Sequence, residues 1–222
     1  MSISPKQFVE TLKRHERFLK GLMGGVRANL QGVNLSGLRL PRINLQHALL
    51  GEANFSQCTL AGANFSFADL TGANFDRSKS PGVDFTRAEL RQATMRHADM
   101  VTGTFREATM HGSNLHGGEF IRSDFGGARL TKANISAANL QGANVANARL
   151  DGSNLRGSIL AGVDLTQADL RDAIVSRGTA TLPLDLQIVL RDHALWIDSN
   201  GKEGHRAVLK DIEPGDADLA NF

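Results

Sequence analysis

Large apolar residues recur at every fifth position over most of this chain. The stretch ANFSFADLTGANF places Phe65, Leu70 and Phe75 five apart, each two residues after an alanine. A helix repeats its apolar face every 3.6 residues and a strand every 2, so neither element explains this spacing. Of the 30 positions divisible by five between 30 and 175, 29 hold Leu, Phe, Met, Ile or Val, and Ser80 is the exception. The pattern predicts a repeat with a five-residue unit.

The residue two positions before each large one is small. Alanine occupies 17 of these 30 positions, and Cys58 occupies another, where we expect a core residue. Such a unit can turn one small and one large side chain inward, but it cannot bury a core alone. The units are therefore expected to stack as a coil, with backbone amides paired between turns about 4.8 Å apart. Glycines after the large residue, such as Gly62 and Gly72, are expected at its corners.

Residues of one kind also recur 20 positions apart. Stacked identical side chains are what coils in register favour, through aromatic contacts or hydrogen-bonded amide ladders. A turn of four units accounts for this spacing. The columns are Phe at 65, 85, 105 and 125, mostly Leu from 30 to 170, and Asn from 34 to 154 with an interruption at Thr94.

In these residues the chain resembles the pentapeptide-repeat family, whose unit is written A(D/N)Lxx. The segments ANFSFADLTGANF, AANLQGANV and GVDLTQADLRDA carry the resemblance, which extends in frame over residues 28–177. It implies an all-β solenoid, a right-handed quadrilateral β-helix with four units per coil. The length of the repeat then gives about seven coils and a rod of roughly 35 Å.

Both ends of such a rod need caps, because unpaired strand edges promote aggregation. At the first end, Ser4 is expected as N-cap, Pro5 suits the first helical position and Gln7 completes a capping box. At the other end, the sequence PLDLQIVLRDHALWID over 183–198 predicts a second helix. The expected domains are an N-terminal capping helix at 1–25, the β-helix at 26–178, and at 179–222 a C-terminal helix followed by a degenerate cap or the start of a second coil.

One helix-then-coil motif occurs twice. The first copy, Leu-x-x-His-x-x-Phe-Leu followed by Gly-x-Arg-Ala-x-Leu, spans residues 12–30. The second spans 190–209, with Trp-Ile in place of Phe-Leu and one extra residue before the glycine. We interpret the shared residues as the fixing points of a helix-to-coil junction rather than as ligand-binding groups. They are His15, Arg27, His193, Trp196 and Arg206.

Composition and motifs favour a cytoplasmic protein without a catalytic site. A lone cysteine fits a reducing compartment, and the chain contains neither a signal-peptide core nor an apolar run of 18 residues. The histidines at outward positions lack carboxylate or thiolate companions at ligand spacing, and no nucleotide loop or nucleophile elbow is present. Packing residues occupy the inward positions. We therefore expect no enzyme, no cofactor, no metal and no membrane span.

Two exterior features are candidates for an interaction surface. One is a modest group of basic residues near the middle of the rod, with acids beside it, which we interpret first as a solvated face. The other is Phe67, the one ring that the register places outside. The candidate residues are Arg91, Arg96, Arg106, His111, His116 and Phe67.

We predict a non-catalytic scaffold that binds another protein through the rod faces or the terminal helix, with a homodimer through the C-terminal helix as a further contact. The family resemblance also implies an alternative, a DNA mimic that binds type II topoisomerases and protects them from quinolones. Residues 28–177 carry 15 basic and 13 acidic residues in an unbroken frame, and this balance disfavours the DNA mimic. Direct nucleic-acid binding through the basic group is a second alternative, but no aromatic stacking platform accompanies it.

Overall fold

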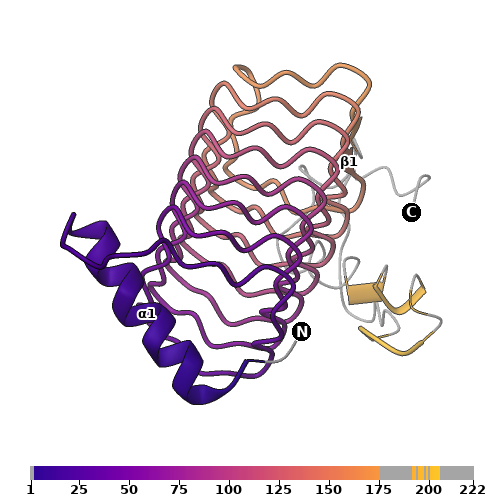
Figure 1. The fold of residues 1–222 in the computed structure, drawn as a ribbon. Helices are drawn as coiled ribbons and strands as arrows, with labels where there is room; N and C mark the ends of the chain where they lie inside the picture. The colour runs from indigo at the N-terminus through magenta and orange to yellow at the C-terminus, as the bar shows by residue number, and fades with distance from the viewer. Residues whose placement is uncertain (1–2, 176–191, 194, 198, 200, 206–222) are drawn as a thin grey trace, which may run out of the picture.

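The computed structural model describes residues 3–175, 192–193, 195–197, 199 and 201–205. From Asn29 to Arg149, every fifth residue except Asn144 pairs in parallel with the residue 20 positions later. Four such positions occur in each 20-residue turn, so the chain winds as a four-sided coil. Figure 1 shows the turns stacked into a rod, with helix α1 at the end where the first turns lie.

Each side of the coil contributes only a short piece of extended chain, because a turn follows in every unit. Two adjacent residues pair in strands β1 (Asn154–Leu155) and β2 (Ile174–Val175), which are parallel, with Asn154 opposite Ile174. Elsewhere in the described rod the turns are joined by single bridges. At one of them, the N–H of Phe65 donates to the carbonyl of Asp84 at 2.7 Å, and the N–H of Asp84 donates to Ala63 at 2.9 Å.

The second residue after each large one forms a corner with a left-handed backbone. Glycine takes this conformation without steric cost, as at Gly62 with φ of +64°. Other residues adopt it as well, including Phe67 at +58° and Thr102 at +55°, although Cβ makes it unfavourable by about 1–2 kcal/mol. The glycines therefore lie at the corners that the sequence predicts, and the corner requirement extends to residues that the glycine pattern alone does not reveal.

Asn and Asp side chains bind their own turns, and some also reach the neighbouring turn, as Asn144 Nδ2 does when it donates to Asp124 Oδ1 at 2.8 Å. The Oδ1 atom of Asn54 accepts the N–H of Ser56 at 2.9 Å, and similar bonds recur in many other units. This geometry satisfies a turn N–H that has no partner in the coil, which is why the carboxamide is used within its own turn. Thr94, which interrupts the Asn column, donates from Oγ1 to Asn74 Oδ1 of the preceding turn at 3.2 Å.

Phenylalanine rings fill the first part of the core. In the column at 65, 85, 105 and 125, consecutive ring centroids lie 4.7 to 5.3 Å apart, and the rings are stacked as the sequence predicts. Phe55 stacks on Phe75 at 5.0 Å, and edge contacts of 5.2 to 5.6 Å join the two columns. Cys58 is buried among the core residues, and this burial raises the pKa of its thiol.

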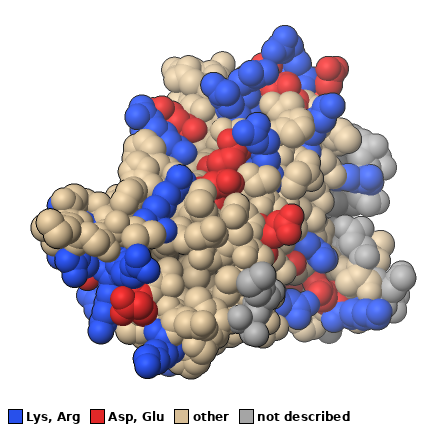
Figure 2. Space-filling model, viewed as in Figure 1, with Lys and Arg blue, Asp and Glu red and all other residues tan. Residues whose placement is uncertain are grey.

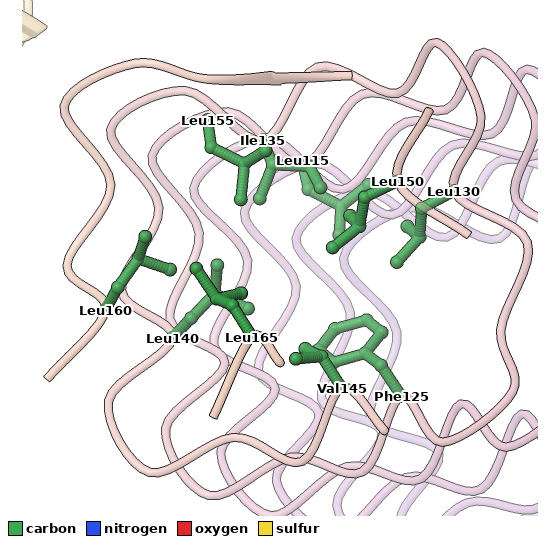
Figure 3. Close-up of a pocket in the computed structure, with 10 residues that line it drawn as sticks. All are labelled: Leu115, Phe125, Leu130, Ile135, Leu140, Val145, Leu150, Leu155, Leu160 and Leu165. Carbon is green, nitrogen blue, oxygen red and sulfur yellow. The ribbon is translucent and has the colours of Figure 1, made fainter. Parts of the chain in front are cut away.

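Toward the other end of the rod the inward side chains are mainly aliphatic (Figure 3). They enclose a void of about 10 Å³ with no polar lining. A void of this size without polar partners does not hold an ordered water. Its lining residues are Leu115, Phe125, Leu130, Ile135, Leu140, Val145, Leu150, Leu155, Leu160 and Leu165.

Helix α1 (Pro5–Leu19) begins with the capping box that the sequence predicts. Ser4 Oγ accepts the N–H of Gln7 at 3.3 Å, and Gln7 Oε1 accepts the N–H of Ser4 at 3.1 Å. Phe8 and His15 are the buried residues of the helix, so one face packs on the rod. The remainder of the helix is largely exposed and carries Lys, Arg and Glu.

The two phenylalanines at positions 65 and 67 provide a direct test of the register. Phe65→Ala removes a fully buried ring and should lower the free energy of unfolding by about 3–5 kcal/mol. Phe67→Ala truncates a ring that is 43% exposed and should cost about 1 kcal/mol or less. Urea unfolding followed by circular dichroism measures both, and equal losses in the two variants would contradict the register.

The left-handed corner at Thr102 should be improved by glycine. Thr102→Gly relieves a β-branched residue at φ of +55° and should raise the free energy of unfolding by about 1 kcal/mol. The matched control is Thr104→Gly, at a position that bridges to Asp84 and Asp124, where glycine should destabilise by about 0.5–1 kcal/mol. Thermal unfolding of both variants decides the point, and a lower melting temperature for Thr102→Gly would be inconsistent with strain at this corner.

Candidate interaction surface

The candidate surface residues lie on three different corners of the rod. Residues 20 apart share a corner, so Arg91 and His111 occupy one, and Arg96 and His116 occupy the next. Arg106 lies on a third, beside the column that contains Phe67. The structure therefore does not gather the six residues into one patch.

Arg91 and Arg106 are paired with acids. Arg91 Nη2 lies 2.6 Å from Glu89 Oε2, and Arg106 Nη1 lies 2.9 Å from Asp124 Oδ2. The hydrogen bond that Arg106 donates to the Asp124 carboxylate raises the pKa of the Arg106 guanidinium. Figure 2 shows Lys and Arg interspersed with Asp and Glu on the face in view, so charge of both signs is mixed there. Exposed pairs of this kind form a solvated face rather than a concentrated cationic surface.

Phe67 belongs to a continuous column of outward side chains. The His47 ring stacks on it with centroids 4.9 Å apart, and the Arg87 guanidinium lies 5.8 Å from its centroid on the next turn. Arg87 Nε in turn donates to Glu107 Oε2 at 2.8 Å. The ring therefore has neighbours 20 residues away in both directions and is still 43% exposed. We name His47, Phe67, Arg87 and Glu107 the Phe67 column.

The corner that carries Arg77, Arg96, His97 and His116, here the Arg77 corner, is in contact with a distant part of the chain. The described residues between 192 and 205, here the C-terminal unit, reach it through Glu203. One carboxylate oxygen of Glu203 accepts from Arg77 Nη2, and the other lies 2.6 Å from His97 Nε2. Between the unit and the corner lies an open hollow of about 220 Å³. Its lining residues are Arg96, His116, Leu195, Ser199, Lys202 and Glu203.

The pKa values of His97 and Glu203 are both lowered at this contact. Burial lowers the pKa of His97, and Arg96 and Arg77 lower it further against the opposing effect of Glu203. Burial alone would raise the pKa of Glu203, but His97 and Arg77 bring it below its ordinary value. The His116 ring lies edge-on to His97 with centroids 5.5 Å apart, and its Nδ1 is 2.8 Å from Ser136 Oγ.

The first junction joins α1 to the rod through a buried histidine. His15 is fully buried, and its Nδ1 accepts the N–H of Ala28 at 3.0 Å. Burial is the main cause that lowers the pKa of His15. Arg27 Nε donates to the carbonyl of His47 in the next turn. These contacts lie where the helix passes into the coil.

The second copy of the motif is described in part. Its described residues from 192 to 197 are helical, and the rest of the predicted helix at 183–198 lies outside the described residues. The His193 ring stacks on Trp196 with centroids 5.7 Å apart. Arg206 lies outside the described residues, as does the segment 206–222 in which the sequence predicts a cap or a second coil.

Sequence reasoning missed Arg77, His97 and Glu203. Arg77 and His97 occupy ordinary corner positions, which carry many polar residue types and give no signal. Glu203 offers one signal, because it stands where Gly24 stands in the first copy of the duplicated motif. That signal marks a divergence between the copies without indicating what the carboxylate contacts.

Within the described residues, no group of three or more His, Cys, Asp and Glu side chains is placed to hold a metal ion. In the same part of the chain, no helix has the length and apolar character needed to span a membrane.

The repeat itself identifies the family. A family model described as pentapeptide repeats (8 copies) matches residues 42–77, 73–106, 84–120, 108–145 and 138–177, which together make up more than half of the chain. The chain belongs to the pentapeptide-repeat family. No curated protein matches it.

Solved structures with this repeat are similar to the chain. One is a pentapeptide repeat protein from the thylakoid lumen of Arabidopsis thaliana, 32% identical over 43% of this chain and 66% of that one, just under two thirds, with a TM-score of 0.42. HetL from Nostoc sp. strain PCC 7120, a protein involved in heterocyst differentiation regulation, is 23% identical over 78% of this chain and 94% of its own, with a TM-score of 0.36. QnrB1, a plasmid-mediated fluoroquinolone resistance protein, is 19% identical over 65% of this chain and 79% of its own, with a TM-score of 0.40.

The buried histidines predict a loss of stability in mild acid. Because burial lowers the pKa of His15 and of His97, the unfolded chain binds more protons than the folded one below the ordinary histidine pKa of about 6.5. Stability should be complete above that pH and should fall as the pH decreases toward the folded-state pKa values. Urea unfolding between pH 7.5 and pH 5.5 measures the slope.

The control for this prediction is His15→Gln, which keeps an acceptor for the Ala28 N–H and removes one titrating ring. The variant should lose part of the pH dependence seen in the unaltered chain. A slope that is the same in both proteins would exclude His15 as a contributor.

Proposed function

We propose that the chain is a non-catalytic cytoplasmic scaffold, a right-handed quadrilateral β-helix of about seven coils that binds another protein through the side of the rod. The observation that carries the proposal is the contact at the Arg77 corner. There a helical unit of the chain lies against the rod, and its carboxylate is held between a guanidinium and an imidazole. A corner that accepts this unit has the shape and charge to accept a similar segment of a partner.

The packed interior of the rod supports a function that is carried by its outer surface. Inward positions of the described rod are occupied by packing side chains, and the void that the aliphatic residues enclose is about 10 Å³. Small-molecule sites are clefts of several hundred Å³, typically about 300–1,000 Å³, with convergent polar groups. The polar groups of this chain instead stand on its corners, where they repeat at the spacing of the turns.

The chemistry of the corner indicates the kind of partner. Arg77, Arg96 and two histidines face the hollow or the contact beside it, and Asp76 lies at the same corner. Arg77 and His97 contact the carboxylate of Glu203. We therefore infer a protein partner that presents an acidic side chain beside a short helix.

The described acids do not support the DNA-mimic alternative. Carboxylates such as Asp69 and Asp84 accept backbone N–H groups of their own turns, and Asp124 also pairs with Arg106. A mimic of DNA needs dense, uncompensated negative charge along the rod. The near balance of basic and acidic residues gives no such field.

Affinity purification with the full chain as bait, from the cells that produce it, tests the proposal. A partner retained by the unaltered chain should be lost with Arg96→Glu, because the reversed charge repels an acidic segment. Arg122→Glu makes the same charge change at a different corner and should leave capture unchanged. Equal capture by both variants, or a strict monomer without any partner in light scattering, would contradict the proposed surface.

A further inference from the structure

The two copies of the helix-then-coil motif fold alike where the structure describes both. In the first, the His15 and Phe18 rings stack with centroids 5.8 Å apart and planes 16° apart. In the second, His193 and Trp196 stack at 5.7 Å and 15°. Equal spacing in the sequence has therefore produced the same ring geometry twice. In this ring pair the C-terminal unit resembles the unit that begins the rod.

The glycine after each helix has the same role in both copies. A Cβ atom on Gly25 would lie 2.4 Å from the backbone nitrogen of Phe18, and one on Gly204 would lie 2.2 Å from the carbonyl oxygen of Asp192. Real Cβ atoms do not approach backbone this closely, so both glycines allow the chain to return against its own helix. Both copies therefore require glycine at this position, although only Gly204 has a left-handed backbone, with φ of +71°.

The two copies of the motif contact different parts of the rod. The first unit lies at the end of the rod and accepts the N–H of Ala28 with His15. The second unit contacts the side of the rod, and the contact is made by the residue that replaces Gly24, namely Glu203. The neighbouring Lys202, which replaces Met23, lines the hollow at the same place. Two of the substitutions that separate the copies thus lie where the second unit touches the rod.

We propose that the C-terminal unit is a former capping unit that now acts as a detachable cover for the Arg77 corner, occupying in cis the site that an acidic partner segment takes. This inference rests on the proposed function, since a cover matters only where the corner binds a partner. Glu203 is the anchor, and the partner competes with it for Arg77 and His97.

The size of the contact explains why the cover detaches. In the described part of the unit, the ion pair is made by the carboxylate of Glu203, whose side chain is 28% exposed, with Arg77, whose side chain is 56% exposed. Ion pairs between partly exposed groups contribute little to stability and weaken with salt. The hollow of about 220 Å³ between the unit and the corner remains open rather than closely packed. A partner with a larger apolar contact can therefore displace the unit.

Close approach of the unit to the rod depends on the small residue at Gly117. A Cβ atom at this position would lie 3.0 Å from Leu195 Cδ2 and 2.5 Å from His97 Nδ1. The backbone of Gly117 is also left-handed, with φ of +63°. The corner is thus shaped to admit both the imidazole that binds Glu203 and the leucine beside it.

Trp196 reports on the cover, because it is the only tryptophan in the chain and belongs to the C-terminal unit. In Glu203→Gln, quenching of its fluorescence by acrylamide should increase about twofold or more, since the undocked state becomes the major population. Added salt should produce the same increase in the unaltered chain. Glu107→Gln, which breaks an exposed pair with Arg87 at another corner, is the matched control and should leave quenching unchanged.

A charge exchange separates undocking from unfolding of the unit. Arg77→Glu should release Trp196 as Glu203→Gln does, although it alters no residue of the unit. The double variant Arg77→Glu with Glu203→Arg should restore protection from acrylamide. The proposal would be overturned if quenching were identical in the unaltered chain and in both single variants. It would also be overturned if the protection of Trp196 depended on protein concentration, because the contact would then form between two molecules.

A peptide probe tests the cover and the proposed partner site separately. A labelled peptide of residues 190–209 should bind full-length Glu203→Gln about tenfold more tightly than the unaltered chain, in which the corner is occupied, as measured by anisotropy. It should not bind Arg77→Glu combined with Glu203→Gln. If Trp196 is released but the peptide does not bind, the cover is supported and the corner is overturned as a partner site. If the peptide binds the unaltered and Glu203→Gln chains equally, the cover alone is overturned.

Discussion

The parallel pairing of each residue with the one 20 positions later determines the rest of this structure. Because successive turns lie at the spacing of paired strands, each side chain has a neighbour of the same register above and below it. The inner columns then become stacks of rings or aliphatic chains, and the corners become outward columns. Left-handed corners make this winding possible, and the protein accepts many non-glycine residues there.

The sequence predicts most of the rod, since the period of five sets which residues turn inward and the period of 20 sets which ones stack. The Phe column at 65–125 and the capping box at Ser4 follow directly from local patterns that the structure reproduces. The period of 20 predicts Asn ladders, but the Oδ1 atoms of this column accept N–H groups of their own turns, as at Asn54 and Asn74. The column pattern alone therefore does not predict the hydrogen bonds that form within each turn.

The candidate surface was less predictable for a physical reason. Corner positions tolerate almost any polar residue, so the pattern does not distinguish Arg77 or His97 from their neighbours. The contact of these two residues with Glu203 joins positions more than 100 residues apart, and no period of the repeat relates them. The basic residues at 91 and 106 stood out in the sequence, yet acids beside them neutralise their charge. Burial against a distant unit, rather than charge itself, distinguishes the Arg77 corner.

A nitroxide label on the rod measures the central contact in solution. Cys58 is buried with a raised thiol pKa, so Arg96→Cys supplies the reactive thiol at the Arg77 corner. The single indole N–H signal of Trp196 should be broadened by this label when the C-terminal unit is docked, and it should sharpen again when Glu203→Gln is added. An indole signal that is unaffected by the label in the chain with Glu203 intact would contradict the docking of the unit on the rod.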